Sequence, residues 1–179
     1  MPRTRSFAYL RRPRHLNVQG LDWFIGSVLP KIRAQIPDCG LIIAGEAGKA
    51  RRWPDGVVTL GGLSNIEEAY ARASIVINPT LFGTGLAVKN IEALSFGKPL
   101  VTTAAGARGV GPKLSSAMRI AADEQRFVSY VVELLHNKTE RDALAKTALA
   151  TVQGWRNQQV ANLDAAIRGA SSMSRPVGA

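Results

Sequence analysis

Two glycines, a lysine and a glutamate follow one another within a short stretch: Gly83, Gly85, Lys89 and Glu92. Glycines have no Cβ, so the backbone beside them can approach a ligand closely. A helix that starts near Leu86 would direct its free N–H groups and the positive end of its dipole at this loop, which suits a phosphate. Lys89 and Glu92 are three residues apart and would project from one side of that helix. The spacing therefore favours an anionic ligand held by the loop, with one cation and one carboxylate beside it.

The residues on either side of this stretch have the pattern of buried parallel strands. Residues 74–78 and 100–103 are rich in β-branched side chains, and Gly97 with Pro99 would end the helix between them. On that helix, Val88, Ile91 and Leu94 are expected to face the sheet. Strand, glycine loop, helix and strand form one βαβ unit, and open α/β sheets bind ligands at the C-terminal ends of such strands. The alternative is an ordinary surface, since glycine-rich turns are common and the lysine and glutamate would then form an exposed ion pair.

The rest of the chain alternates predicted strands and helices. Strands are expected at residues 6–10, 39–44, 57–60 and 118–121. A helix is expected from 18 to about 35, with Asn17 as its N-cap and a kink caused by Pro30, and another from 64 to about 73. Three helices are expected after Asp123. Thr139 would cap the second, Leu144 and Leu149 would point inward from it, and Gly154 would end it, while residues 158–168 would form the third. This alternation predicts an α/β fold, a Rossmann-like parallel sheet with helices on both faces.

The composition is that of a soluble globular domain. The 179 residues are 46% hydrophobic, enough for one domain with a core. No apolar run approaches the ~20 residues of a membrane span, and no signal-peptide pattern is present. Cys39 is the one cysteine, which excludes an intramolecular disulfide and suits a reducing cytoplasm. We expect it to be a small buried hydrophobic residue.

The net charge of +10 is spread unevenly. Five arginines precede the first acidic residue, Asp22, and a second basic cluster lies at residues 49–52. Such a surplus favours anionic partners: nucleotide phosphates, anionic lipid head groups or nucleic acid. Nucleic acid is disfavoured because the basic stretches carry no recognition motif and no interleaved aromatic residues. The alternative, a solvated basic surface, accounts for most of these charges.

A longer pattern connects the segments. Its most diagnostic part is Gly83-x-Gly85-x-x-x-Lys89-x-x-Glu92-Ala93 followed by Gly97-x-Pro99-x-Val101-x-Thr103, and further matching segments are residues 17–24, 28–30, 41–45, 58–61, 70–73, 76–79 and 133–135. In this order the segments resemble the C-terminal, donor-binding domain of GT-B glycosyltransferases, in the retaining family called glycosyl transferases group 1. The resemblance covers roughly residues 17 to 168.

The resemblance implies a nucleotide-sugar site in a Rossmann-like domain that forms the C-terminal half of a GT-B fold and closes with C-terminal helices. The residues placed by position are Glu92 on the ribose hydroxyls, Lys89 on the diphosphate, Gly83, Thr84 and Gly85 along the diphosphate and sugar, and Gly61, Gly62 and Leu63 against the base. Amide dipoles and a cation would stabilise the charge of the leaving nucleoside diphosphate. No metal and no cofactor besides the donor substrate is expected, and no catalytic residue is assigned.

The chain departs from the family pattern in three ways. Thr84 stands where many members carry a glutamate near the donor sugar, and no glycine near Leu10 ends the first strand. The N-terminal acceptor domain is missing, and active sites of this fold lie between the two domains. We therefore expect a glycosyltransferase donor domain that is inactive alone, from either a truncated reading frame or an isolated domain.

The expected organisation is a basic N-terminal segment at residues 1–16 with a possible first strand, a nucleotide-sugar-binding domain at 17–168 and a disordered tail at 169–179. The expected partners are a nucleotide sugar and an acceptor domain or partner chain, in the cytoplasm, with the inner face of a membrane as a possible peripheral contact. One alternative is a non-catalytic nucleotide-sugar-binding or regulatory module. Another is a Rossmann-like epimerase or dehydrogenase, which the lack of Gly-x-Gly-x-x-Gly at the first βα turn disfavours.

Overall fold

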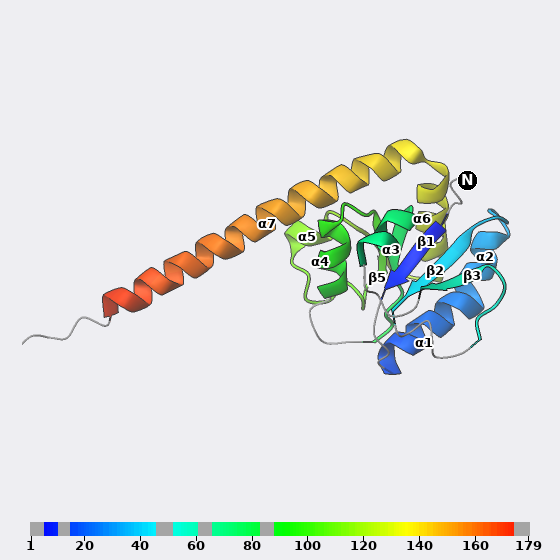
Figure 1. The fold of residues 1–179 in the computed structure, drawn as a ribbon, viewed down its shortest axis with the longest axis horizontal. Helices are drawn as coiled ribbons and strands as arrows, with labels where there is room; N and C mark the ends of the chain where they lie inside the picture. The colour runs from blue at the N-terminus through cyan, green and yellow to red at the C-terminus, as the bar shows by residue number, and fades with distance from the viewer. Residues whose placement is uncertain (1–5, 11–14, 46–51, 61–65, 83–87, 174–179) are drawn as a thin grey trace, which may run out of the picture.

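The computed structural model describes residues 6–10, 15–45, 52–60, 66–82 and 88–173 (Figure 1). A six-stranded sheet lies at the centre of this part of the chain. Its strands are β1 (Ser6–Leu10), β2 (Gly40–Ala44), β3 (Val57–Leu60), β4 (Ile75–Asn78), β5 (Leu100–Thr103) and β6 (Arg119–Ala121). The predicted strands are thus all present.

The strands lie in the order β3-β2-β1-β4-β5-β6, and every neighbouring pair is parallel. The order reverses between β1 and β4, which pair with Ala8 opposite Val76. In open α/β sheets the crevice for a ligand lies at such a switch point, outside the C-terminal ends of the strands. The predicted Rossmann-like sheet is confirmed.

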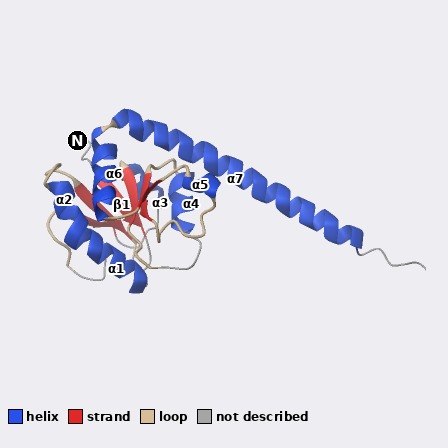
Figure 2. Ribbon diagram, turned by 180° about the vertical axis from the view of Figure 1, so that it is seen from behind, coloured by secondary structure: helices blue, strands red, loops and turns tan. Residues whose placement is uncertain are grey.

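Helices cover both faces of the sheet (Figures 1 and 2). They are α1 (His15–Trp23), the π-helical turn η1 (Phe24–Val28), α2 (Leu29–Arg33), α3 (Ile66–Arg72), α4 (Val88–Ser95), α5 (Pro112–Ser115), α6 (Glu124–His136) and α7 (Lys138–Met173). One core contains side chains of α1, η1, α2 and α6 together with Leu144 near the start of α7, and the other contains side chains of α3, α4 and α5 with Ala148 and Val152 further along α7. Each face of the sheet therefore has its own helical layer.

The first helical stretch begins at His15, two residues before the predicted cap Asn17. Pro30 is expected to kink this helix. In the structure the helix is not interrupted before Pro30 but contains a wider, π-helical turn there. Pro30 has no N–H to donate to the carbonyl of Gly26, four residues back, and its ring would clash with that carbonyl. The helix instead forms the π-turn η1, in which the N–H of Leu29 bonds to the carbonyl of Phe24.

Helix α4 ends as predicted. Gly97 has a φ of +62°, and the N–H of Lys98 bonds to the carbonyl of Ala93 at 3.0 Å, which closes the helix in a Schellman-type cap. Its buried face differs from the predicted one. Leu94 and Ile91 do pack in the core, but Val88 is 56% exposed, and Asn90 with Ala93 lies inside. Asn90 is held there by hydrogen bonds, which a hydrophobic pattern does not register.

The C-terminal helices differ most from expectation. Asn137, not Thr139, caps α7, since its Oδ1 accepts from the N–H of Glu140 at 3.0 Å. The helix then runs unbroken through Gly154 to Met173, so residues 158–168 are its continuation and not a third helix. A glycine inside a helix costs about 1 kcal/mol relative to alanine, which α7 tolerates. Leu144 is buried as predicted, whereas Leu149 is half exposed.

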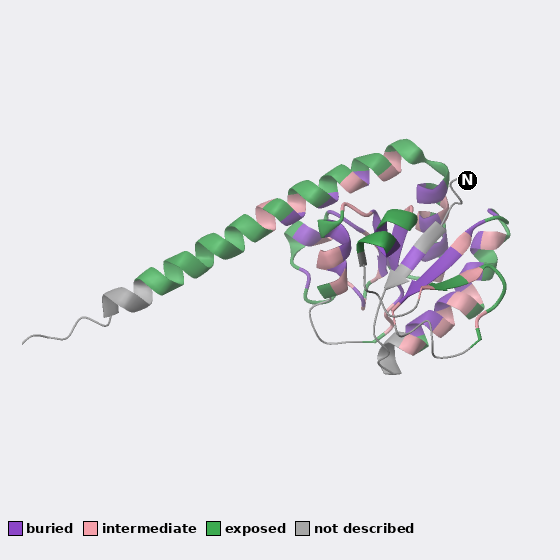
Figure 3. Ribbon diagram, in the orientation of Figure 1, coloured by how far each residue is buried: buried purple, intermediate pink, exposed green. Residues whose placement is uncertain are grey.

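The far part of α7 extends away from the rest of the molecule, and its described side chains from residue 156 to 168 are all exposed (Figure 3). The helix also includes residues 169–173 of the predicted tail. The domain boundaries at 16 and 168 remain predictions. Among the described helices, none combines the length and the apolar character needed to cross a membrane.

Candidate functional site

The predicted site residues fall into two groups. Gly61, Gly62, Leu63, Gly83, Thr84 and Gly85 lie outside the described residues, so their placement stays a prediction. Lys89 and Glu92 lie on α4, and both side chains are half-buried. The helix follows β4, the strand at the switch point, and packs on the same face of the sheet as α3.

Lys89 is oriented by the segment that follows β4. Its Nζ donates a hydrogen bond of 2.7 Å to Oγ1 of Thr80. Thr80 comes two residues after the end of β4, and its hydroxyl donates to Oδ1 of Asn78 at 2.7 Å. The ammonium of Lys89 therefore lies at the C-terminal edge of the sheet, just beyond the end of β4.

Beneath Lys89 is a buried polar network. Nδ2 of Asn78 donates to Oδ1 of Asn90 at 2.8 Å, and Nδ2 of Asn90 donates to the carbonyl of Gly106 at 2.9 Å. Asn78 is 1% exposed and Asn90 is fully buried. Buried amides are costly unless hydrogen-bonded, and here the two satisfy each other and the backbone. The network links β4, α4 and the turn after β5.

The turn after β5 is bound to the same edge by two threonines. Oγ1 of Thr102 donates to the carbonyl of Asn78 at 3.2 Å, and Oγ1 of Thr103 donates to the carbonyl of Thr80. Thr103 in turn accepts from the N–H of Gly106 at 2.9 Å. These bonds hold the backbone of the site against movement relative to the sheet.

Glu92 contacts a different partner. The hydroxyl of Tyr70 on α3 lies close enough to the Glu92 carboxylate for the two groups to interact. The Tyr70 ring is almost fully buried and stacks on Phe96, with ring centroids 4.3 Å apart and planes 19° apart. Burial first, and then the charge of Glu92, raise the pKa of Tyr70, so this hydroxyl stays a proton donor. The Glu92 carboxylate thereby has a neighbouring hydroxyl group, while its side chain remains partly accessible.

Helix α1 closes the other side of the switch point. Gly20 lies so near the end of β4 that a Cβ there would come within 2.2 Å of the carbonyl oxygen of Pro79. Only glycine allows this approach, and the close contact brings the middle of α1 against the backbone of Pro79 and Thr80.

The polar network was not predicted from the sequence. In the sequence, Asn78 is the last residue of a predicted strand and Asn90 lies on the predicted helix that follows the glycine loop. A signal was present in the pattern, since an asparagine that ends a buried strand and another on the core side of the following helix both need partners. The sequence does not reveal the partner of Asn90, because Gly106 lies in a turn that no local pattern connects to this helix.

The arrangement suits a ligand that carries both negative charge and hydroxyl groups. Lys89 supplies one oriented cation, and Glu92 supplies a carboxylate acceptor one helical turn further along α4. Both lie where parallel sheets of this kind bind their ligands.

Comparison with known proteins identifies the family to which this chain belongs. The model of the family described as glycosyl transferases group 1 matches residues 4–137, more than half of the chain. An uncharacterized 44.6 kDa protein in the cps region of Klebsiella pneumoniae is 30% identical over 149 residues, which cover 76% of this chain and 38% of that protein.

Two solved structures show the same fold. WaaG, a glycosyltransferase involved in lipopolysaccharide biosynthesis, superposes with a TM-score of 0.66 at 18% identity, over 84% of this chain and 43% of WaaG. The Anabaena protein HepE, solved in complex with UDP and glucose, superposes with a TM-score of 0.65 at 16% identity, over 91% of this chain and 48% of HepE. The chain thus spans less than half the length of each of these three proteins.

Proposed function

The chain belongs to the glycosyl transferases group 1 family and has the Rossmann-like fold of a GT-B glycosyltransferase domain, and from this premise we propose that it binds the nucleoside diphosphate of a nucleotide-sugar donor. The bound donor would then serve transfer of its sugar to an acceptor. The predicted resemblance to this family is confirmed.

The observation that carries the proposal is the oriented pair on α4. Lys89, held by Thr80, supplies positive charge where a diphosphate would lie, and Glu92, next to Tyr70, supplies a carboxylate that would accept hydrogen bonds from ribose hydroxyls. The complex of HepE with UDP and glucose supports a ligand of this class at the shared fold. Charge that develops on a leaving nucleoside diphosphate is stabilised by such a preorganised cation.

For the other predicted site residues we propose the contacts that the family resemblance implies. Backbone groups of Gly83, Thr84 and Gly85 are proposed to meet the diphosphate and the sugar, and Gly61, Gly62 and Leu63 to lie against the base. Because the chain spans 38% of its Klebsiella relative, we propose that turnover needs an acceptor domain or partner chain. Without one, the chain would act as a nucleotide-sugar-binding module. A cytoplasmic location, with the basic surplus contacting an anionic membrane face, remains a prediction.

Titration calorimetry tests the ribose contact. The purified chain is titrated with UDP, ADP and GDP and with their 2′-deoxy forms. Loss of a buried hydrogen-bond partner costs on the order of 1–3 kcal/mol, so Glu92→Ala and removal of the 2′-hydroxyl should each weaken binding by that amount. Glu133→Ala, an exposed glutamate on α6, is the control and should bind like the parent chain. If Glu92→Ala binds the diphosphate as tightly as the parent does, the ribose assignment is wrong.

A further inference from the structure

In the hydrogen bonds that connect Lys89 to Thr80, Asn78 and Asn90, the chemistry of each group fixes which partner donates and which accepts. An ammonium group can only donate hydrogen bonds, so Oγ1 of Thr80 accepts one from Lys89. The Thr80 hydroxyl then donates its own hydrogen bond to Oδ1 of Asn78. That oxygen also accepts from the N–H of Thr80 at 3.3 Å. The amide nitrogen of Asn78 must then point the other way, toward Oδ1 of Asn90 and the carbonyl of Gly106. Each group has one orientation in which the whole series is satisfied.

The lower end of this series cannot shift. Asn90 is fully buried and its nitrogen donates to the carbonyl of Gly106. Gly106 itself is enclosed, since a Cβ there would lie 2.4 Å from Oγ1 of Thr102 and 2.9 Å from Nδ2 of Asn78. The upper end differs, because Lys89 and Thr80 are only half-buried. A buried pair of amides thus supports, through Thr80, a partly exposed lysine at the C-terminal edge of the sheet.

We propose that Asn78 and Asn90 are positioning residues for the Lys89 ammonium, acting through the hydroxyl of Thr80. The inference rests on the proposed function, in which Lys89 meets the diphosphate. A free lysine has a four-carbon stem whose rotamers must be frozen when it binds an anion. Holding the ammonium in place beforehand removes part of that cost, and the benefit falls on the ligand's second phosphate rather than on its ribose or base.

The first test measures the diphosphate increment, the ratio of affinities for a nucleoside diphosphate and its monophosphate, using whichever of UDP, ADP and GDP binds best. Thr80→Val and Asn90→Leu should each lower this ratio about five- to tenfold, the size of one ordinary net hydrogen bond. In the Lys89→Met background the same two substitutions should leave the ratio unchanged, because the residue they position is gone. Ser95→Ala is the control on the same helix, as its exposed hydroxyl bonds to the carbonyl of Ile91 within α4.

A ratio that still falls when Lys89 is methionine would show that these residues act on the fold and not through the lysine, and would overturn the proposal. An unchanged ratio in Thr80→Val and Asn90→Leu with the lysine present would do the same. Thr80→Val preserves shape at a half-buried position, so it remains informative if Asn90→Leu unfolds.

The second test needs no nucleotide and separates this inference from the proposed function. Carbon-13 relaxation at Cε of Lys89 reports the order of its side chain in the ligand-free chain. The order should fall in Thr80→Val and Asn90→Leu and stay the same in Ser95→Ala. If the parent chain shows an ordered Lys89 but binds no diphosphate, the proposed function fails and the positioning stands. If Lys89 is equally mobile in all three variants and in the parent, the positioning is wrong.

Discussion

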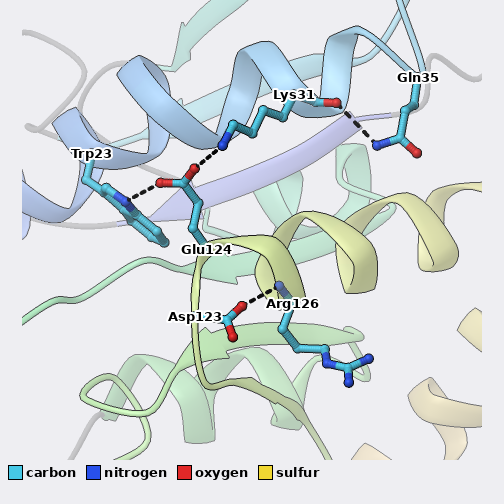
Figure 4. A network of polar contacts seen from close by, with 6 residues as sticks. All are labelled: Trp23, Lys31, Gln35, Asp123, Glu124 and Arg126. Carbon is cyan, nitrogen blue, oxygen red and sulfur yellow. Dashed lines mark hydrogen bonds and ion pairs between the residues drawn. The ribbon is translucent and has the colours of Figure 1, made fainter.

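Trp23 and Glu124 are joined across 101 residues of sequence by a hydrogen bond of 3.1 Å from the indole Nε1 to a carboxylate oxygen (Figure 4). The other carboxylate oxygen accepts from Nζ of Lys31 at 2.5 Å. Trp23 also packs edge-on against Phe127, with ring centroids 5.7 Å apart. The contact ties α1 and α2 to the first turn of α6, so the helical layer on one face of the sheet is held together by polar bonds as well as by its core.

Glu124→Gln should destabilise the chain in a pH-dependent way. The hydrogen bond from Lys31, with a smaller one from Trp23, holds the pKa of Glu124 below its ordinary 4.5 against the opposing effect of desolvation. A carboxyl with a lowered pKa contributes stability above the unfolded-state value, and that contribution disappears as the pH falls through the folded-state value. We expect Glu124→Gln to lower the free energy of unfolding by about 0.5–1.5 kcal/mol near neutral pH, and the difference to shrink toward zero in acid.

Urea denaturation of both proteins from neutral pH down to the acid limit of folding measures this difference. Glu133→Gln, an exposed residue of the same helix, provides the control. A difference that is constant across the whole range would mean that the charge of Glu124 is not what stabilises the contact.

Tyr70→Phe should weaken ribose recognition while leaving the packing intact. Phenylalanine keeps the ring that stacks on Phe96 but removes the hydroxyl that lies next to Glu92. Glu92 then adopts other rotamers, and the loss of an interaction the size of one hydrogen bond predicts about 0.5–1.5 kcal/mol less discrimination between ribose and 2′-deoxyribose diphosphates. Calorimetric titration gives both affinities. Tyr130→Phe, on α6, should not change the discrimination, and an unchanged value in Tyr70→Phe would exclude a role of the hydroxyl in holding Glu92.

Gly106→Ala should destabilise the fold through overpacking. The added methyl group would collide with Oγ1 of Thr102 and Nδ2 of Asn78, both buried, so the network must move or break. Overpacking of this kind costs about 1–3 kcal/mol. Gly26→Ala is the matched control, because a Cβ at that position would meet no atom within 4 Å beyond its chain neighbours and the backbone of its own helix. Thermal unfolding of the two variants should differ clearly, and equal midpoints would show that the site accommodates a methyl group.

The far part of α7 should exchange its amide protons faster than α4 does. Leu144, Ala148 and Val152 bury the near part of α7 against the domain, whereas Val160, Leu163 and Ile167 are 61%, 62% and 56% exposed. Helical hydrogen bonds without tertiary packing open easily. Hydrogen exchange should therefore be faster over residues 158–168 than over 88–94, and equal protection of the two segments would contradict this.

The same exposed side chains predict weak self-association. Exposed apolar surface tends to be covered by another chain. Sedimentation velocity should show a concentration-dependent increase in mass for the parent chain and a smaller one for Leu163→Asp. A parent chain that stays monomeric at high concentration would argue against this stripe as a contact surface.

Local sequence determined the βαβ unit around the site. The β-branched residues of β4 and β5, the left-handed Gly97 and Pro99 act on their own segment of backbone, so their effect can be read without knowing the fold. The alternation of such segments also determined the parallel sheet and its two helical layers. Lys89 and Glu92 were found because their spacing on one helix is itself a local property.

Only the tertiary structure decided which polar groups hold those two side chains. Asn78, Asn90 and Gly106 come together from a strand, a helix and a turn, and Tyr70 reaches Glu92 from a separate helix. The same holds for α7. This helix continues past Gly154 although glycine disfavours helix, so the surrounding helix and not the glycine's intrinsic preference decides its length. A hydrogen-bond partner or a packing surface is contributed by residues distant in sequence, and the energy of such a contact exists only once the chain has brought them together.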